Sequence, residues 1–516
     1  MKTFTLNPTH AAARDYPWLA DLGNGQYRNP ILHADYSDPD VIRHGEDFWM
    51  TASSFNCTPG LPILHSRELV NWQLINHAVK NLPHARYAEV QPGCGIWAPA
   101  IRFHAGKFWI FFPTPDEGIY VIAATDPAGQ WSEPHLLQAG KGLIDPCPLW
   151  DDDGQAYLVH AYAGSRAGIK HRLRVCPMAP DGSRLLGEGQ IIFHEPENHP
   201  TIEGPKFLKR DGWYYILAPA GGVATGWQVV LRSRNIFGPY EDQIVLAQGR
   251  TPINGPHQGA LVDTPRGEWW FIHFQDAGVH GRITHLQPVR WEGGWPLMGV
   301  NGADNIGEPV LVHRKPNLPA AKAEPLPTSD EFTGAQPGRQ WQWNANHRDD
   351  WHSLIARPGW LRLFAQPRAA SGWDHAPHLL LQKFPARCFT VETLVQLGAQ
   401  SDGEEAGLAI VGRQSAALAI VRDGDAHQII FRTNGASTTL LTRAGASVRL
   451  RVHVADGGEC TFAFATDAGK FTPVEKTFQA QPGVWIGARV GIYSTRTAAS
   501  GGHADFDYFR FGPAAS

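Results

Sequence analysis

The feature that most constrains the fold of this 516-residue chain is a repeat in its first three hundred residues. In each copy a glycine precedes a short apolar and aromatic run, the pattern of a tight turn followed by a β-strand. The five glycines are Gly45, Gly106, Gly154, Gly212 and Gly267, in the stretches HGEDFWMTAS, HAGKFWIFFP, DDGQAYLVHA, RDGWYYILAP and PRGEWWFIHF. They lie 61, 48, 58 and 55 residues apart, and a period of about fifty residues with several short strands per copy is typical of propeller blades. The sequence therefore predicts a five-bladed β-propeller.

A side chain suited to chemistry stands seven to ten residues before each of these glycines, close to a proline in every copy. We take these five positions as equivalent in the repeat. Because the innermost strand of each blade lines the central channel, they should converge at one end of it. The five residues are Asp38 in YSDPDVI, Trp97 in GIWAPAI, Asp145 in LIDPCPLW, Glu203 in TIEGPKF and His257 in NGPHQGAL.

Three of these five side chains are carboxylic acids, and three like charges facing one small space are unfavourable. Proteins retain such clusters for acid–base chemistry or for binding a metal ion. A calcium cage needs six to eight oxygens, which usually come from Asp and Asn residues clustered in one loop. Acids on three separate blades fit a hydrolase site better. The plain alternative is three unrelated carboxylates that form local turn hydrogen bonds.

Composition excludes several classes of protein. Lys and Arg (45) nearly balance Asp and Glu (49), so neither nucleic acid nor an anionic membrane is an expected partner. The six cysteines form no CxxC pair, so no zinc or thioredoxin motif is indicated. No apolar run reaches 18 residues, and the first twenty residues have no apolar segment of secretory length. We expect a cytoplasmic protein as the sequence stands, or a periplasmic or secreted one if a leader was removed.

The second half of the chain has a different pattern. Residues 311–327 are rich in Pro and Ala and read as a linker after a catalytic domain at 1–310, whose first 27 residues form an N-terminal extension. Residues 328–516 contain short alternating strands with turns every eight to twelve residues, which predicts a β-sandwich. The expected fold class is therefore all-β.

The motifs around the repeat resemble those of glycoside hydrolase family 43, within its β-xylosidase and α-L-arabinofuranosidase group. The stretches NPILHADYSDPDVIRHGEDFWMTASSF, GIWAPAIRFHAGKFW, DPCPLWDDDGQAYLVH, IEGPKFLKRDGWYYILAPAGG and GPHQGALVDTPRGEWWFIHFQD occur in the family's order, across residues 28 to 300. The closing ADFDYFRFG resembles the end of a concanavalin-like jelly roll that follows the propeller in many members. In the family this domain often lends a loop to the pocket, and the stretch from Trp485 to Arg489 is our candidate for it.

The resemblance implies a role for each of the three acids. Asp38 would be the general base, Glu203 the general acid, and Asp145 the residue that orients the acid and raises its pKa. The family inverts configuration, which predicts that the carboxyls of Asp38 and Glu203 lie about 6.5–9.5 Å apart, with a water between them. We expect Arg282 to keep Asp145 ionised.

The resemblance also implies a set of substrate contacts. Trp97 would be the floor of the subsite for the non-reducing sugar, Phe55 a wall beside it, and Arg282 a contact to the sugar. His257 resembles a channel histidine that in several members sits near calcium or its waters. No cofactor is required for the chemistry, and a structural calcium in the channel is compatible with the pattern. Ala100 departs from the polar or acidic residue that many members have after this motif.

The function that these observations favour is an exo-acting, inverting β-xylosidase that releases xylose from xylo-oligosaccharides or hemicellulose side chains, with α-L-arabinofuranosidase activity in the same pocket. A chain that is mainly an arabinofuranosidase is the nearest alternative. A non-catalytic sugar-binding propeller is the alternative from another class. The expected partner is an oligosaccharide or polysaccharide, and an oligomer is compatible with the sequence.

Overall fold

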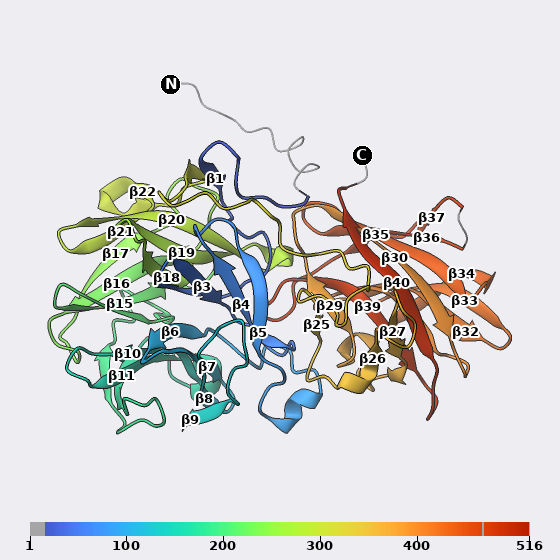
Figure 1. Ribbon diagram of the computed structural model, residues 1–516, viewed down its shortest axis with the longest axis horizontal. Coiled ribbons are helices and arrows are strands. Elements are labelled where there is room, and N and C mark those ends of the chain that lie inside the picture. The colour runs from blue at the N-terminus through green and yellow to red at the C-terminus, as the bar shows by residue number, and fades with distance from the viewer. Residues whose placement is uncertain (1–15, 467–468, 515–516) are drawn as a thin grey trace.

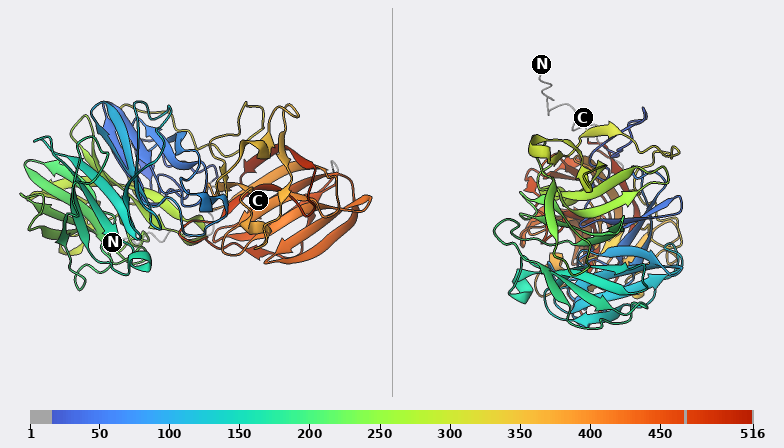
Figure 2. Two further views of the ribbon diagram at one scale, coloured as in Figure 1. Left: turned by 90° about the horizontal axis from the view of Figure 1, so that it is seen from below. Right: turned by 90° about the vertical axis from the view of Figure 1, so that its left-hand side faces the viewer.

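A computed structural model describes residues 16–466 and 469–514, which form two all-β domains side by side (Figure 1). The N-terminal domain, blue to yellow in the figure, is a ring of five sheets, and the C-terminal domain, orange to red, is a sandwich of two. Seen from below, the two domains form distinct lobes joined along one side (Figure 2). Both predicted architectures are confirmed. The first 15 residues of the predicted N-terminal extension lie outside the described part of the chain.

Each propeller blade is an antiparallel sheet whose strands follow one another in the chain. The strands, blade by blade, are β2 (Asp40–His44), β3 (Asp47–Thr51), β4 (Gly60–Ser66) and β5 (Gln73–Val79); β6 (Ala100–His104), β7 (Lys107–Thr114), β8 (Gly118–Ala124) and β9 (His135–Ala139); β10 (Leu143–Trp150), β11 (Ala156–Tyr162), β12 (Leu173–Met178) and β13 (Gln190–Phe193); β14 (Lys206–Arg210), β15 (Trp213–Ala220), β16 (Trp227–Ser233) and β17 (Glu241–Leu246); and β18 (His257–Asp263), β19 (Trp269–Asp276), β20 (Arg282–Glu292) and β21 (Trp295–Met298).

The five repeat glycines form the tight turn between the first and second strand of each blade. All five have φ between 63° and 82°, a left-handed conformation that glycine adopts without steric cost. The first strands of the blades are neighbours around the ring, since β2 contacts β6 and β18, and β10 contacts β6 and β14. They are the innermost strands, so the segments leading into them open at the channel.

The segment before the first blade closes the ring against the fifth blade. Tyr27 and Asn29 both donate side-chain hydrogen bonds to the carbonyl of Leu286 on β20, at 2.8 Å each. Leu32 pairs with Thr284 on the same strand. The residues between this segment and β2 are therefore fixed on the fifth blade before they reach the channel.

The predicted linker is partly ordered as a strand. Residues 312–314 form β24 (Val312–Arg314), which pairs with β1 (Gln26–Arg28) in an antiparallel sheet. Just before it, β22 (Val300–Asn301) and β23 (Gly307–Glu308) extend the fourth blade. The boundary that we expected at residue 311 thus falls between strands that pair with the propeller domain. A Pro- and Ala-rich composition does not predict the pairing of β24 with β1, which lies almost 300 residues earlier in the chain.

The sandwich packs two eight-stranded sheets around one large apolar core. The first sheet contains β25 (Gln342–Trp343), β28 (Gln366–Pro367), β29 (Leu380–Lys383), β31 (Glu405–Val411), β32 (Ala416–Asp423), β33 (Ala426–Thr433), β34 (Ala436–Ala444) and β39 (Arg489–Arg496). The second contains β26 (His352–Ser353), β27 (Leu361–Phe364), β30 (Phe389–Gly398), β35 (Ser447–Val454), β36 (Glu459–Ala465), β37 (Thr472–Pro473), β38 (Phe478–Gln479) and β40 (His503–Gly512).

Helices are scarce in the described residues, where the single α-helix is α1 (Gly164–Ala167) in the third blade. Of the helices in these ranges, none has the length and apolar character needed to cross a bilayer.

Candidate active site

A shared backbone turn lies near the start of the channel strand in four blades. A residue with positive φ occupies this turn in blades one, three, four and five: Asp38 (54°), Asp145 (57°), Gly204 (60°) and Gln258 (40°). At a non-glycine residue this conformation costs about 1 kcal/mol or more, and it persists where the surroundings over-determine it. We expected the five site residues to occupy equivalent positions, but they are offset by one residue between blades. Glu203 and His257 come one residue before the turn, whereas Asp38 and Asp145 form it.

Asp38 is a buried acceptor at the centre of the site. Its side chain is 6% exposed. Its Oδ2 accepts hydrogen bonds from the hydroxyls of Ser37 at 2.7 Å and Ser53 at 2.6 Å. Its Oδ1 accepts from Arg282 Nη1 at 3.1 Å. Because a carboxylate oxygen can accept two hydrogen bonds, Oδ1 has capacity to accept one more, from a water.

Asp145 and Glu203 are neighbouring acids from the third and fourth blades. Asp145 Oδ2 accepts the backbone N–H of Gly204, the residue after Glu203, at 2.7 Å. Burial, followed by the negative charge of Glu203, raises the pKa of Asp145 to about 7. We expected Asp145 to raise the pKa of Glu203; the raised pKa that the structure shows is that of Asp145 itself. Glu203 is the more open of the two, with a side chain 25% exposed.

Arg282 contacts Asp38, which corrects the prediction that it keeps Asp145 ionised. Arg282 Nη1 lies 2.9 Å from the Ser37 hydroxyl and within 3.3 Å of both Asp38 oxygens. This arginine begins β20 in the fifth blade, which is next to the first blade around the ring. The sequence motif predicted an arginine at the site but did not show whether it contacts Asp38 or Asp145.

His257 is completely buried, and its Nε2 lies 3.1 Å from Glu203 Oε1. Its Nδ1 is buried without a hydrogen-bond partner among the described residues. In that part of the chain, no three or more His, Cys, Asp and Glu side chains are grouped to hold a metal ion. Calcium prefers six to eight oxygen ligands, so this imidazole does not fit as a direct calcium ligand. Its observed contact is to Glu203.

Two aromatic rings from the first two blades lie together and form what we call the aromatic wall. The rings of Phe55 and Trp97 have centroids 6.5 Å apart, and Trp97 Nε1 donates to the carbonyl of Gly93 at 3.2 Å. The Arg166 guanidinium lies 4.9 Å from the centre of the Trp97 ring. The two aromatic residues that we predicted from the sequence are therefore together, with a cation over one of them.

The sandwich reaches this wall through Trp485, in the segment that we predicted for this role. Its ring centroid lies 6.3 Å from that of Trp97, and the Arg282 guanidinium lies 5.7 Å from the centre of the Trp485 ring. The residue is 46% exposed and has a φ of 66°. The neighbouring Val484 packs so closely on Gly93 that an added Cβ there would lie 2.5 Å from Val484 Cγ1. Both domains therefore build the rim of the site.

Three further residues of the site were not predicted. Ser53 hydrogen-bonds Asp38 from the loop after β3, and Arg166 approaches Trp97 from the third blade. Asp35, only three residues before Asp38, accepts hydrogen bonds from the backbone N–H groups of Arg282 and Gly487. Its proximity to Asp38 in ADYSDPD is the one signal that sequence reasoning could have used, because the other two depend on contacts between separate blades.

Comparisons with known proteins agree with this architecture. Residues 27–296 match the family described as glycosyl hydrolases family 43, and residues 329–512 match the β-xylosidase C-terminal concanavalin A-like domain. A protein of Xylanibacter ruminicola whose provisional name is β-xylosidase is 40% identical over 480 residues, which cover 92% of this chain and 87% of that protein.

Two other similar proteins carry different names. The non-reducing end α-L-arabinofuranosidase BoGH43B of Bacteroides ovatus is 28% identical, with 96% of each chain covered. The crystal structure of a xylan β-1,4-xylosidase from Bacillus halodurans superposes with a TM-score of 0.82 at 26% identity, covering 94% of this chain and 99% of that one. Together with the two domain matches, these likenesses establish that the chain belongs to family 43 of the glycoside hydrolases and is an enzyme that hydrolyses glycosidic bonds.

Proposed function

We propose that this enzyme is an exo-acting, inverting β-xylosidase that removes xylose from the non-reducing ends of xylo-oligosaccharides or hemicellulose side chains. The observation that carries the proposal is the cluster of acids from three blades, in which Asp38 and Asp145 are buried and Glu203 is partly exposed. The names of the similar proteins, β-xylosidase and xylan β-1,4-xylosidase among them, support the xyloside.

Glu203 is the proposed general acid, which protonates the oxygen of the leaving group. Its greater exposure suits a group that must reach a bond between two sugars. His257 Nε2, at 3.1 Å from Oε1, holds its carboxyl in place. Asp145 fixes the backbone beside Glu203 by accepting the N–H of Gly204.

Asp38 is the proposed general base, which deprotonates the attacking water on the opposite face of the sugar. All of its protein contacts are donors: Ser37, Ser53 and Arg282. They hold the carboxylate in one orientation and leave Oδ1 able to accept the water. Arg282 is also the proposed contact to a sugar hydroxyl, with Trp97 and Phe55 as the stacking wall.

The sandwich loop at the rim supports the proposed exo mode. Trp485 lies close to both Trp97 and Arg282, where it would hinder a polysaccharide chain from continuing past the site on that side. A xylopyranoside and an arabinofuranoside present similar hydroxyls, and a similar protein is named an arabinofuranosidase. We therefore propose arabinofuranosidase activity as a secondary function of the same pocket.

The proposed mechanism uses two carboxyl groups and no metal ion. A calcium held through waters near His257 would act on the structure of the channel. We expect rates on an aryl xyloside to be unchanged after dialysis against a chelator. A loss of rate that added calcium restores would overturn this part of the proposal.

The test of substrate compares initial rates on aryl β-D-xylopyranoside and aryl α-L-arabinofuranoside. The proposal predicts a higher kcat/KM on the xyloside. A higher value on the arabinofuranoside would make this enzyme mainly an arabinofuranosidase, and turnover of neither would contradict the proposed substrate class.

A further inference from the structure

We propose that Asp35 is a positioning residue for the glycosidase reaction, because it fastens the sandwich loop that carries Trp485 to the propeller strand that carries Arg282. The inference rests on the proposed function only in taking Arg282 and Trp485 as parts of the working site. Asp35 lies in the segment between β1 and β2.

The two oxygens of Asp35 bind two different domains. Oδ1 accepts the backbone N–H of Arg282 at 2.9 Å, and Oδ2 accepts the backbone N–H of Gly487 at 2.9 Å. Both bonds are buried. Charge-assisted hydrogen bonds of this kind are about twice as strong as neutral ones. One carboxylate thus connects the first blade, the fifth blade and the sandwich.

The backbones at this junction approach too closely for side chains. A Cβ added to Gly281 would lie 2.5 Å from Asp35 Cγ, and one added to Gly487 would lie 2.7 Å from the Gly281 nitrogen. The next sandwich residue, Ala488, donates its N–H to the Val279 carbonyl at 2.8 Å. The backbone of the sandwich loop therefore packs directly on the backbone of the fifth blade, and the Asp35 carboxylate accepts a hydrogen bond from each side.

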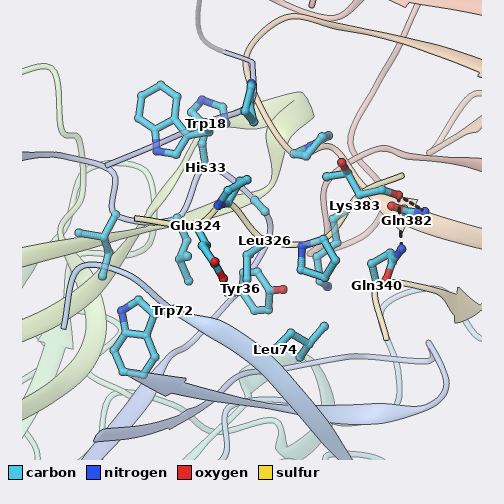
Figure 3. A pocket seen from close by; sticks show the side chains of 18 of the residues that line it. Trp18, His33, Tyr36, Trp72, Leu74, Glu324, Leu326, Gln340, Gln382 and Lys383 are labelled. Carbon is cyan, nitrogen blue, oxygen red and sulfur yellow. Dashed lines mark hydrogen bonds between the residues drawn. The ribbon is translucent and has the colours of Figure 1, made fainter. Parts of the chain in front are cut away.

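A partly buried lysine of the sandwich provides the opposite charge. Lys383 ends β29, and its ammonium lies 5.3 Å from the centre of the Tyr36 ring. Both residues line the pocket between the two domains, where Figure 3 shows them with Gln382 and Gln340. Burial raises the pKa of Asp35, while the positive charges of Lys383 and Arg282 oppose that rise. The cost of burying the Asp35 carboxylate at the domain interface is thus offset by its two backbone N–H donors and by the nearby positive charges.

The geometry points to one consequence for the site. The Arg282 side chain holds Asp38 at 3.1 Å, and Trp485 lies two residues from the Gly487 N–H. Release of Asp35 would therefore loosen a contact to the base and the pocket rim together. A misplacement of about 1 Å at such a site can cost about a hundredfold in rate.

The test compares Asp35→Asn with Glu404→Gln as a matched control. Glu404 is, like Asp35, a buried carboxylate whose two oxygens accept backbone N–H groups, from Ser401 at 2.9 Å and Gly502 at 2.8 Å. It lies within the sandwich. An Asn at position 35 keeps one acceptor and turns an N–H₂ donor toward the other backbone N–H.

We expect both variants to lower the Tm and only Asp35→Asn to lower kcat/KM, by about ten- to a hundredfold on aryl xyloside. In a Trp485→Ala background the further loss caused by Asp35→Asn should be smaller than in the native enzyme, since the two residues act through one loop. An Asp35→Asn variant with native kcat and KM would overturn the inference. Failure of the native enzyme to cleave the xyloside would instead count against the proposed substrate.

Hydrogen exchange on the unmodified enzyme tests the same connection if Asp35→Asn does not fold. Xylose binding should slow exchange in peptides covering 279–284 and 484–489 to a similar degree. Protection of the first peptide without the second would contradict a role for Asp35 in joining them.

Discussion

The backbone N–H of Gly204 donates to the Asp145 carboxylate at 2.7 Å, and this bond ties the residue beside Glu203 to the neighbouring blade. The two acids belong to separate repeats, so their spacing depends on how the blades pack around the channel. Burial, and after it the negative charge of Glu203, raises the pKa of Asp145 to about 7.

Replacement of Asp145 with Asn should make the protein more stable at alkaline pH while lowering its activity. The folded-state pKa of about 7 lies above the ordinary 3.8, so the stability that Asp145 contributes is full below pH 4 and falls as pH rises toward 7. The variant removes this loss. Urea midpoints at pH 5 and pH 8 should show a gain relative to the native protein that is larger at pH 8, and an equal difference at both would contradict the assignment.

Replacement of Arg282 with Lys should lower kcat on aryl xyloside by about ten- to a hundredfold, because the shorter lysine side chain would not bring its nitrogen to the position of Nη1, which contacts Ser37 and both Asp38 oxygens. Arg43→Lys is the matched control. Arg43 pairs with Asp263 at 2.6 Å and joins the same two blades on the part of the strands farther from the acids. An equal loss of kcat in both variants would indicate a general effect on ring closure.

Replacement of Trp485 with Ala should raise KM for xylo-oligosaccharides by about tenfold, because a half-exposed aromatic ring at the rim offers a stacking surface. Trp360→Ala, which removes an aromatic residue stacked on Arg357 elsewhere in the sandwich, should leave KM unchanged. Steady-state kinetics on xylobiose and on an aryl xyloside measure the effect. An unchanged KM in Trp485→Ala would remove this residue from the pocket.

Buried histidines should make the fold sensitive to acid. Burial lowers the pKa of His273 and His280 to about 4, and that of His33 and His285 well below 6.5. Their contribution to stability is full above pH 6.5 and is lost as pH falls toward 4. Each such histidine contributes up to about 1.4 kcal/mol per pH unit in that window. Urea unfolding of His280→Phe should show a weaker loss between pH 6.5 and 5 than the native protein, and an identical pH slope would contradict the prediction.

The sequence was sufficient for the propeller because its signal is local. A glycine such as Gly45 allows the tight turn between two strands, and a similar aromatic strand follows the glycine in every blade. Asp38 and Glu203 could be found in the same way, since each stands beside a proline just before a channel strand.

The sequence did not predict which charged residues of different blades pair with each other. The choice of Asp38 over Asp145 as the partner of Arg282 depends on the fifth blade closing next to the first. The role of Asp35 depends on a sandwich residue 452 positions away in the chain. Such contacts follow from packing between domains, which no local pattern encodes.

The central claim is that Glu203 protonates the leaving group of a xyloside while Asp38 activates water on the opposite face. The most direct measurement follows xylobiose hydrolysis by proton NMR with the native enzyme and Glu203→Gln. We predict that the native enzyme first releases α-xylose, and that the variant loses at least about a hundredfold in rate on xylobiose and much less on an aryl xyloside with an acidic leaving group. Initial release of β-xylose, or a variant that cleaves xylobiose at the native rate, would contradict this account.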